Sequence, residues 1–265
     1  MLVRNLLLRI YRLFSIQFGL DPIKTIRSMR GLPKYVKDFL LFRSSYKGTI
    51  KFVPCFHDIY DEGGRTKSEY FWQDLLVARE IFETNPHKHV DIGSRVDGFV
   101  AHVASFREIE VFDVRPITTN VPGIVFRKAD LMNRVSISSY AGNNGYCDSL
   151  SCLHALEHFG LGRYGDPIDP NGYRYGIENM ALLLKHNGFF YLSIPIGWER
   201  VEFNANRIFN PLDIIILAKK YNLRLQKVIQ ISRDGYIKEI LINDSVIEKL
   251  AMEEYNLGVF IFQKT

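Results

Sequence analysis

The stretch 89–103, HVDIGSRVDGFVAHV, decides the fold of this chain. Its apolar start is typical of a buried strand, Gly93 suits a tight turn, and Gly98 opens a helix. Short apolar runs and helical patterns then alternate along the chain. The expected strands are 89–92, 110–114, 124–127, 147–153, 189–194, 223–232 and 258–263, and the expected helices are 67–84, 98–106, 177–185, 212–220 and one within 243–255. This alternation predicts an α/β fold with a mostly parallel sheet and an antiparallel C-terminal strand at its edge.

Acidic residues accompany the carboxyl ends of the first three expected strands: Asp91, Asp113 and Asp130. Ligands of doubly wound sheets bind at this edge, near the point where the strand order reverses. Asp113 follows Gly93 at the spacing of a carboxylate that binds both hydroxyls of a ribose. The pattern predicts a nucleoside-binding site. The alternative is an unliganded α/β domain whose glycines only serve tight turns.

Three motifs resemble class I S-adenosylmethionine-dependent methyltransferases: VDIGS (90–94), VFDV (111–114) and CDSLSCLHALEHF (147–159). The chain is similar, over nearly its whole length, to a methyltransferase-like family associated with bacterial surface-polysaccharide synthesis. The shared stretches are FGLDPIKTIRSMRGLPKYVKDF (18–39), GRYGDPIDPNGY (162–173) and SIPIGWERVEFNANRIFNP (193–211). The resemblance implies a Rossmann-like class I methyltransferase fold that binds S-adenosylmethionine.

The resemblance also implies which residues hold this cofactor. They are Asp91, Gly93 and Ser94 at the methionine end, Asp113 at the ribose, Asp130 at the adenine edge, and Cys152 and Leu153 beside the sulfonium. Arg95 and Asp97 stand where many methyltransferases have glycine. A dehydrogenase would need G-x-G-x-x-G to bind a pyrophosphate, so the lack of that pattern favours S-adenosylmethionine.

His154, Glu157 and His158 are the candidate catalytic residues, since the resemblance places Glu157 and His158 towards the acceptor. A histidine with an ordinary pKa of ~6.5 suits a general base, with His158 as first choice and His154 as second. The alternative is that Glu157 and His158 only brace the next loop. The same residues match the H-x-x-E-H pattern of a zinc peptidase, but Gly160 and Gly162 end any helix there. No metal is expected, and a divalent ion on Glu157, His158 and Asp166 is the less favoured interpretation.

Two stretches are expected to bind the acceptor. The loop 159–176 is rich in glycine, tyrosine and arginine, and loops of this length in compact domains are usually functional. Its flat rings and charged side chains suit a sugar, with a structural cover over the sheet edge as the alternative. The second stretch is GWERVEFNANRIFNP (197–211), which follows the expected strand 189–194. The residues expected to bind the acceptor in the two stretches are Tyr164, Tyr173, Arg174, Trp198, Asn206 and Arg207.

These features favour an S-adenosylmethionine-dependent methyltransferase that acts on a hydroxyl of a sugar or glycan precursor in surface-polysaccharide biosynthesis. The alternative is a weak or inactive nucleoside-binding scaffold subunit of a polysaccharide assembly complex, an interpretation that Arg95 and Asp97 support.

The chain is expected to have a basic helical extension, 1–64, and a catalytic domain, 65–265, which opens with the helix 67–84. Two or three short helices are expected within 1–45, and one strand at Thr49–Val53. The apolar side chains Phe71, Leu75, Ala78 and Phe82 lie on one stripe of the helix 67–84, which predicts that this stripe is buried.

Positive charge is concentrated in residues 1–47, where ten basic and two acidic side chains give a net charge of +8, while the rest sums to −3. A general nucleic-acid-binding surface is therefore not expected. Arginines interrupt the apolar N-terminal run, so no membrane span is predicted. Residues 2–37 are expected to contact a membrane surface peripherally; the alternative is packing against the catalytic domain or a second subunit, such as a homodimer partner.

Cys55, Cys147 and Cys152 are few and widely spread, so they form neither a disulfide framework nor a zinc site. This usage fits a reducing compartment. A cytoplasmic location is expected, at the inner face of the membrane if the peripheral contact forms.

Overall fold

The computed structural model describes residues 10–11, 13–56, 58–64, 66–142 and 144–265. The chain divides into two compact units, Met1–Arg65 and Thr66–Thr265, at a boundary one residue from the expected one. Residues 2–9 and 12 of the expected membrane contact lie outside the described residues.

The first unit, Met1–Arg65, is built around one long helix rather than two or three short ones. Its described elements are the π-helix η1 (Leu13–Gln17), the helix α2 (Pro22–Ser45) and the 3-10 helix η2 (Asp58–Tyr60). The Asp21-Pro22 start of α2 is confirmed, because the Asp21 carboxylate accepts hydrogen bonds from the backbone N–H groups of Ile23 and Lys24. None of the helices in the described ranges is long and apolar enough to span a membrane.

The segment that follows α2 has no regular secondary structure at Phe52 to Phe56 and packs back against this helix. A Cβ on Gly31 would lie 1.9 Å from the carbonyl oxygen of Phe56, so only glycine allows this approach. Tyr35 and Phe56 meet edge to face with ring centroids 5.2 Å apart, and Phe39 packs on Phe52 at 4.9 Å. The predicted strand Thr49–Val53 is wrong: the described part of this unit contains no strand with which it could pair.

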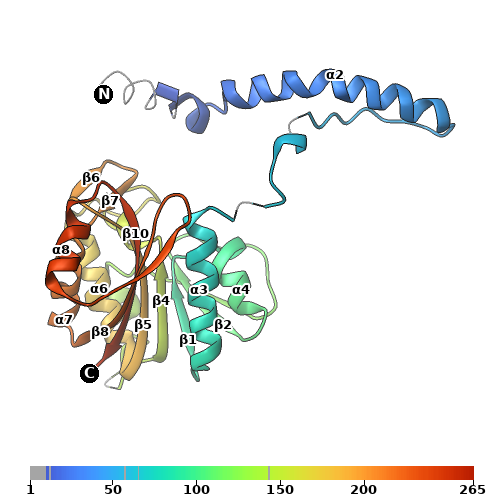
Figure 1. Ribbon diagram of the computed structural model, residues 1–265. Helices are drawn as coiled ribbons and strands as arrows, with labels where there is room; N and C mark the ends of the chain where they lie inside the picture. Colours follow the sequence, from blue (N-terminus) through green and yellow to red (C-terminus); the bar gives the residue numbers. More distant parts are fainter. Residues whose placement is uncertain (1–9, 12, 57, 65, 143) are drawn as a thin grey trace. The chain divides into compact units, whose positions relative to one another are not determined.

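The second unit, Thr66–Thr265, contains an eight-stranded sheet with the order β3-β2-β1-β4-β5-β10-β8-β9 (Figure 1). The strands are β1 (His89–Ile92), β2 (Ile109–Asp113), β3 (Ile124–Lys128), β4 (Cys147–Leu153), β5 (Leu184–Ile196), β8 (Leu223–Ile231), β9 (Ile237–Ile240) and β10 (Asn256–Lys264). The strands β1 to β5 pair in parallel. A separate antiparallel pair joins β6 (Arg200–Glu202) and β7 (Asn206–Ile208). The mostly parallel α/β sheet is confirmed.

The C-terminal strand β10 is antiparallel, as predicted, but it does not lie at the edge. It pairs with β5 on one side and with β8 on the other. The edge belongs to β9, which is not among the expected strands and which forms an antiparallel hairpin with β8. Both faces of β10 are covered, which agrees with its almost continuous apolar sequence.

Helices cover both faces of the sheet (Figure 1). They are α3 (Glu69–Thr84), η3 (Val96–Val100), α4 (Ala101–Ala104), α5 (Arg134–Ile137), η4 (Leu156–His158), α6 (Gly172–Leu183), α7 (Pro211–Lys220) and α8 (Asp244–Met252). Side chains of α3, η3 and α4, such as Val77 and Phe99, form one core cluster. Side chains of α5 to α8, such as Ile177 and Ile214, form the other. The helix predicted at 177–185 begins at Gly172 and ends at Leu183, so 186–188 belongs to β5.

The buried face of α3 differs from the predicted stripe. Phe71, Leu75 and Phe82 are exposed, while Val77 and Ile81 are buried. The same buried face carries Gln73 and Asp74 near the start of the helix. Polar side chains are buried only where they find partners, so this face of α3 indicates a polar site at one end of the sheet.

The strand order reverses between β1 and β4. From β1 the chain continues to β2 and β3 on one side, and from β4 to β5 on the other. Loops that leave β1 and β4 therefore diverge at their carboxyl ends, and the space between such loops is where this class of sheet binds ligands.

Candidate functional site

A buried polar ladder joins β1 to β4. The carboxylate of Asp91 accepts hydrogen bonds from the hydroxyl of Ser94 at 2.7 Å, from that of Ser151 at 2.6 Å, and from the backbone N–H of Ser94 at 3.0 Å. Two residues earlier, the ring of His89 contacts the hydroxyls of Ser149 at 2.7 Å and Ser151 at 3.1 Å. These bonds fix the β1 turn against β4.

Burial shifts the pKa values of Asp91 and His89 so that the neutral form of each is favoured. It raises the pKa of Asp91 to about 6, although the hydrogen bonds from Ser151 and Ser94 oppose the shift. It lowers the pKa of His89 to about 3. Asp91 therefore uses both carboxylate oxygens inside the fold, where it orients the turn at Gly93 and Ser94.

Asp113, the predicted ribose ligand, ends β2 and is paired with Arg115. The Arg115 side chain donates to it from Nε at 3.0 Å and from Nη2 at 2.6 Å, and the backbone N–H of Arg115 donates at 2.8 Å. The same guanidinium lies 4.3 Å from the ring centroid of Tyr164. Asp113, the residue predicted to bind the ribose, is thus already paired with an internal cation.

The other predicted cofactor residues lie at neighbouring strand ends. Asp130 follows β3 and accepts a hydrogen bond from the backbone N–H of Met132 at 2.9 Å. Cys152 and Leu153 are buried at the end of β4, and the N–H of Leu153 donates to the Ser94 hydroxyl at 3.3 Å. Burial holds the pKa of the Cys152 thiol well above its ordinary range. Ser94 and Leu153 are therefore in direct contact.

The predicted catalytic residues come together immediately beyond β4. His154 has φ of +51°, a backbone conformation that is uncommon outside glycine and marks functional sites. Its Nδ1 lies 2.7 Å from Oε1 of Glu157, and the same oxygen is 3.7 Å from Nε2 of His158. Glu157, only 1% exposed, thus lies between two imidazoles.

Three further residues surround these side chains, and the sequence did not predict them. Tyr70 of α3 stacks on His154 with centroids 4.4 Å apart. Glu69, also of α3, lies 3.8 Å from Nε2 of His154. Tyr255, which precedes β10, donates to Glu69 at 2.7 Å. The available signal was the run of polar residues on the buried face of α3. We call Tyr255, Glu69, His154, Glu157 and His158 the His–Glu cluster.

The two histidines of the His–Glu cluster have opposite pKa shifts. Burial lowers the pKa of His154, but the carboxylates of Glu157 and Glu69 outweigh it and the net shift is upward. Burial also lowers the pKa of His158, where Glu157 opposes the shift and Arg163 reinforces it, and the net shift is downward. Burial raises the pKa of Glu157, but His154 and His158 together oppose it and the net shift is downward. At neutral pH this arrangement favours an ion pair of His154 with Glu157 beside a neutral His158 ring, which can accept a proton.

One predicted acceptor residue of the loop 159–176 lies against His158. The ring of Tyr164 meets the His158 ring edge to face at 5.5 Å, and Nη1 of Arg163 is 3.4 Å from His158 Nδ1. The carboxylate of Asp166 accepts from the backbone N–H groups of Gly160, Gly162 and Tyr164, so it shapes this loop. In the part of the chain that the structure describes, no group of three or more His, Cys, Asp or Glu residues is arranged to hold a metal ion.

The remaining predicted acceptor residues have other neighbours. Arg207 is buried and donates to the carbonyl of Phe159 at 2.5 Å, so it anchors the start of the loop. Asn206 donates to the Arg207 carbonyl at 3.4 Å. The guanidinium of Arg174 lies 5.1 Å from the ring centroid of Tyr173. Trp198 is 51% exposed. No contact places these side chains on His158.

Solved structures share this fold at low sequence identity. The 1,6-didemethyltoxoflavin-N1-methyltransferase of Burkholderia thailandensis, solved with 1,6-didemethyltoxoflavin and S-adenosylhomocysteine, is 13% identical, with a TM-score of 0.52. The match covers 93% of this chain and 91% of that one. The [4+2]-cyclase SpnF is 12% identical over 72% of this chain and 81% of its own, with a TM-score of 0.50.

Sequence comparison adds one family match. A family model described as "Caenorhabditis protein of unknown function, DUF268" matches residues 127–235, less than half of the chain. No curated protein matches. The strand order, the antiparallel β10 and these structural likenesses together show that the chain has the fold of the class I S-adenosylmethionine-dependent methyltransferases.

Proposed function

We propose that the protein is an S-adenosylmethionine-dependent methyltransferase that acts on a hydroxyl of a sugar or glycan precursor in surface-polysaccharide biosynthesis. The observation that carries the proposal is the position of the His158 ring, just beyond the end of β4 with its Nε2 3.7 Å from Glu157. Burial lowers the pKa of this ring, which favours its neutral form. A structural neighbour solved with S-adenosylhomocysteine supports the choice of cofactor. The polysaccharide assignment rests on the resemblance of residues 18–39, 162–173 and 193–211 to the family named above.

The residues at the end of β1 fit this cofactor. Gly93 has φ of +70°, and a Cβ there would lie 3.1 Å from the Cβ of Ala155, so glycine lets the turn after β1 lie close to the segment after β4. Gly93 and Ser94 would hold the methionine end, and Asp113 the ribose once Arg115 has moved aside. When bound, the cofactor supplies a methyl group on a positively charged sulfur.

His158 receives the proton of the acceptor. Glu157 faces Nε2 and favours the tautomer that carries its proton there, so the lone pair lies on Nδ1. The acceptor hydroxyl gives its proton to Nδ1 while its oxygen bonds to the methyl carbon, whose bond to sulfur breaks. Glu157 stabilises the imidazolium that forms. Arg163, 3.4 Å from Nδ1, yields that position to the hydroxyl.

Aromatic and cationic groups close to His158 support a sugar as the acceptor. Tyr164 is partly exposed and is contacted by Arg115 and Arg163 at 4.3 and 5.3 Å from its ring centroid. A tyrosine face packs on the C–H groups of a sugar, and guanidinium groups donate hydrogen bonds to its hydroxyls. Tyr173, Arg174 and Trp198 are proposed to bind more distant parts of the glycan.

Titration calorimetry with S-adenosylhomocysteine tests the cofactor, and glycan mass in a strain that lacks the gene tests the reaction. We expect binding heat, and a deletion glycan lighter by the mass of its methyl groups. Folded protein without heat would overturn the cofactor assignment. A glycan with every methyl group retained would overturn the reaction.

The second candidate function is a nucleoside-binding scaffold subunit of a polysaccharide assembly complex. One observation favours it: Arg115 covers Asp113, while Arg95 and Asp97, which replace glycines, pair with each other at 2.6 Å. A deletion strain that loses the polysaccharide itself, and regains it with a His158→Ala protein, would support this alternative.

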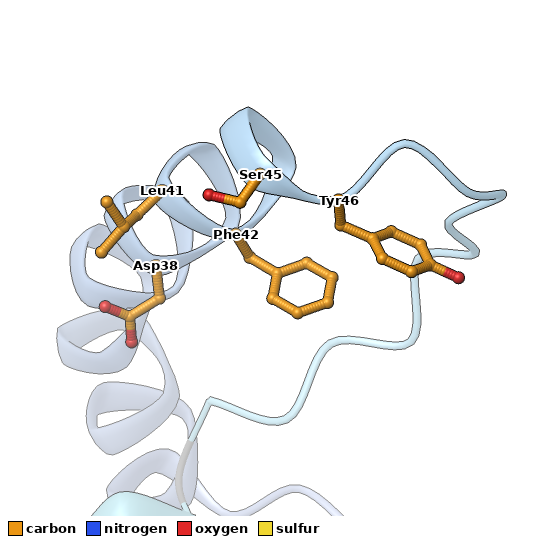
Figure 2. Close-up of a pocket in the computed structure, with 5 residues that line it drawn as sticks. All are labelled: Asp38, Leu41, Phe42, Ser45 and Tyr46. Carbon is orange, nitrogen blue, oxygen red and sulfur yellow. The ribbon is translucent and has the colours of Figure 1, made fainter.

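We further propose that the first unit contacts the cytoplasmic face of an anionic membrane. Met29, Leu32, Val36 and Leu40 recur at helical spacing on α2 and are between 45% and 69% exposed. Leu41 and Phe42 line an open pocket at the end of the same helix (Figure 2).

Charge favours lipid over a second copy of the chain as the occupant of this stripe. Basic side chains, among them Arg27, Arg30, Lys34 and Lys37, accompany the stripe, and the net charge of +8 over residues 1–47 would repel an identical surface. Each basic residue near an anionic membrane surface contributes on the order of 1 kcal/mol. Lipid-linked glycan precursors are held at such a surface.

Vesicle flotation tests this contact with the full chain. We expect the protein to float with anionic vesicles at low salt and less at high salt. Replacing Met29, Leu32, Val36 and Leu40 together by serine should abolish flotation, while serine at Phe71, Leu75 and Phe82, exposed on α3, should not. Undiminished flotation of the first variant would refute the proposal. If the unaltered protein is a dimer and the first variant is a monomer, the stripe belongs to an interface with a second copy.

A further inference from the structure

The His–Glu cluster extends beyond the residues that the proposed reaction uses. Glu69 and Tyr255 belong to α3 and to the segment before β10, and neither contacts His158. Yet the hydroxyl of Tyr255 is 2.7 Å from Glu69 Oε1, and that oxygen is 3.8 Å from His154 Nε2. From there the contacts continue through Glu157 to His158. Segments far apart in the sequence thus form one chain of charged and polar groups, half-buried at Glu69 and Tyr255 and buried at Glu157.

Three atoms of this chain lack partners. Oε2 of Glu69, Nε2 of His154 and Oε2 of Glu157 are buried without a hydrogen-bond partner among the described residues. Buried polar atoms without partners are uncommon, and each is costly. Packing alone would favour apolar side chains at these positions. Their presence indicates that the charges themselves have a role.

We propose that Glu69, held in place by Tyr255, is a positioning residue that fixes the ring of His154 against Glu157 and so controls how strongly Glu157 attracts a proton to His158. The inference rests on the proposed function, because it names what sets the proton affinity of the proposed base. It assigns no contact with substrate to Glu69 or Tyr255.

Charged and titratable groups on several elements set the pKa values of His154 and His158. His154 faces Glu69, Tyr70 and Asp74 of α3, and Glu157 of η4. The groups that act on His158 are Glu157, His154, Arg163, the ring of Tyr164 and the carbonyl of Ala205. Burial and the charge of Glu69 raise the pKa of Tyr255, so it stays a hydroxyl donor.

The direction of the effect follows from these charges. With the Glu69 carboxylate 3.8 Å from its Nε2, His154 keeps its proton and balances the charge of Glu157. Without the charge of Glu69, His154 loses its proton at lower pH, and the unbalanced Glu157 then raises the pKa of His158. The expected shifts are about one pH unit, downward for His154 and upward for His158.

Nuclear magnetic resonance of histidine-labelled full-length protein measures both shifts without cofactor or acceptor. Glu69→Gln should lower the pKa of His154 and raise that of His158, and Tyr255→Phe should shift both in the same directions by less. Glu80→Gln, on the same helix but paired with Lys227 at 2.7 Å, is the matched control and should change neither. His154→Gln and His158→Gln assign the signals.

The outcomes separate this inference from the proposed function. If both pKa values stay unchanged in folded Glu69→Gln and Tyr255→Phe proteins, the inference is wrong, whatever the activity. If the shifts occur and the acid limb of kcat/KM moves up with His158, both proposals stand. If the shifts occur but no methyl transfer is found, the coupling stands and the proposed function fails.

Discussion

Asp113 and Glu157 are carboxylates at the same edge of one sheet, but they differ in how completely their oxygens are hydrogen-bonded. Asp113 ends β2 and receives three hydrogen bonds from Arg115. Glu157 lies beyond β4, receives one contact from His154, and keeps one buried oxygen without a partner in the described part of the chain. We call the ends of β1 to β3, together with Cys152 and Leu153 of β4, the cofactor half of the edge. The acceptor half is His154 with η4, and the end of β5.

The contrast separates two ways to prepare a site. In the cofactor half the polar groups of Asp91 and Asp113 are satisfied internally. Under the proposed function, Arg115 must move aside before the ribose binds to Asp113. In the acceptor half the groups are left incompletely paired, which is unfavourable for stability but leaves charges poised to act on a proton. Each prediction below tests one side of this contrast.

The largest effect is expected in the acceptor half, from the loss of the base. His158→Ala should reduce methyl transfer by about 10²- to 10⁴-fold, the usual contribution of general base catalysis. Labelled S-adenosylmethionine and a glycan extract from the deletion strain provide the measurement. Binding of S-adenosylhomocysteine should stay the same.

The exposed His186 on β5 provides the control, and His186→Ala should retain full activity. Full activity in His158→Ala itself would remove the base from the mechanism and leave His154 as the next candidate.

Asp91 should show the cost of the cofactor half as a pH effect on stability. Its pKa is raised to about 6 in the fold from 3.8. The folded state therefore holds the proton more tightly, and the stabilisation is present below pH 4 and lost as pH rises through 6. Relative to Asp91→Asn, which cannot ionise, the protein should lose about 3 kcal/mol of stability across this range.

Urea unfolding at pH 4, 5, 6 and 7 checks the prediction for Asp91. The opposite dependence expected from the buried His89 is common to both proteins and cancels in the difference. A stability difference that stays constant over this range would show that Asp91 is ionised at low pH despite its burial.

Asp113 and Arg115 should have opposite effects on cofactor affinity. Asp113→Ala removes charged hydrogen bonds to the ribose and should weaken binding of S-adenosylhomocysteine by about 1–3 kcal/mol. Calorimetry on the purified variant gives this value directly. Affinity equal to that of the unaltered protein would place the ribose elsewhere.

The smallest effect is expected from Arg115→Ala, and its sign is informative. Removing the internal partner of Asp113 should strengthen binding of S-adenosylhomocysteine by about 1 kcal/mol. The reason is that the partly exposed ion pair of Arg115 with Asp113 no longer competes with the ribose for this carboxylate. Weaker binding would mean that Arg115 contacts the cofactor instead of competing with it, and the contrast between the halves would need revision.

The sequence predicted the cofactor half more fully than the acceptor half, for a physical reason. The residues of VDIGS are neighbours along the chain, and the turn geometry at Gly93 is local. The pair of Tyr255 and Glu69 spans 186 positions and exists only because β10 enters the sheet. Periodicity carries no information on such a contact.

The sequence contains local signals for β9 and for the buried face of α3, but stronger patterns nearby pointed elsewhere. The Asp234-Gly235 turn is typical of a hairpin and precedes β9, yet half of that strand is exposed and lacks an apolar pattern. In α3, large aromatic residues pointed to the wrong stripe, because Gln73 and Asp74 occupy the buried one. A functional site breaks the apolar pattern at the positions where it is built.

The position of β10 has a consequence for folding. β10 lies between β5 and β8, and the Lys264 ammonium donates to the carbonyls of Ala181 and Leu184, each at 2.7 Å. Until β10 enters the sheet, β5 and β8 each leave an apolar strand edge unpaired, and such edges are prone to pair with other chains. A folding intermediate that has not yet placed residues 256–264 is therefore open to aggregation, and a chaperone that covers these edges protects it.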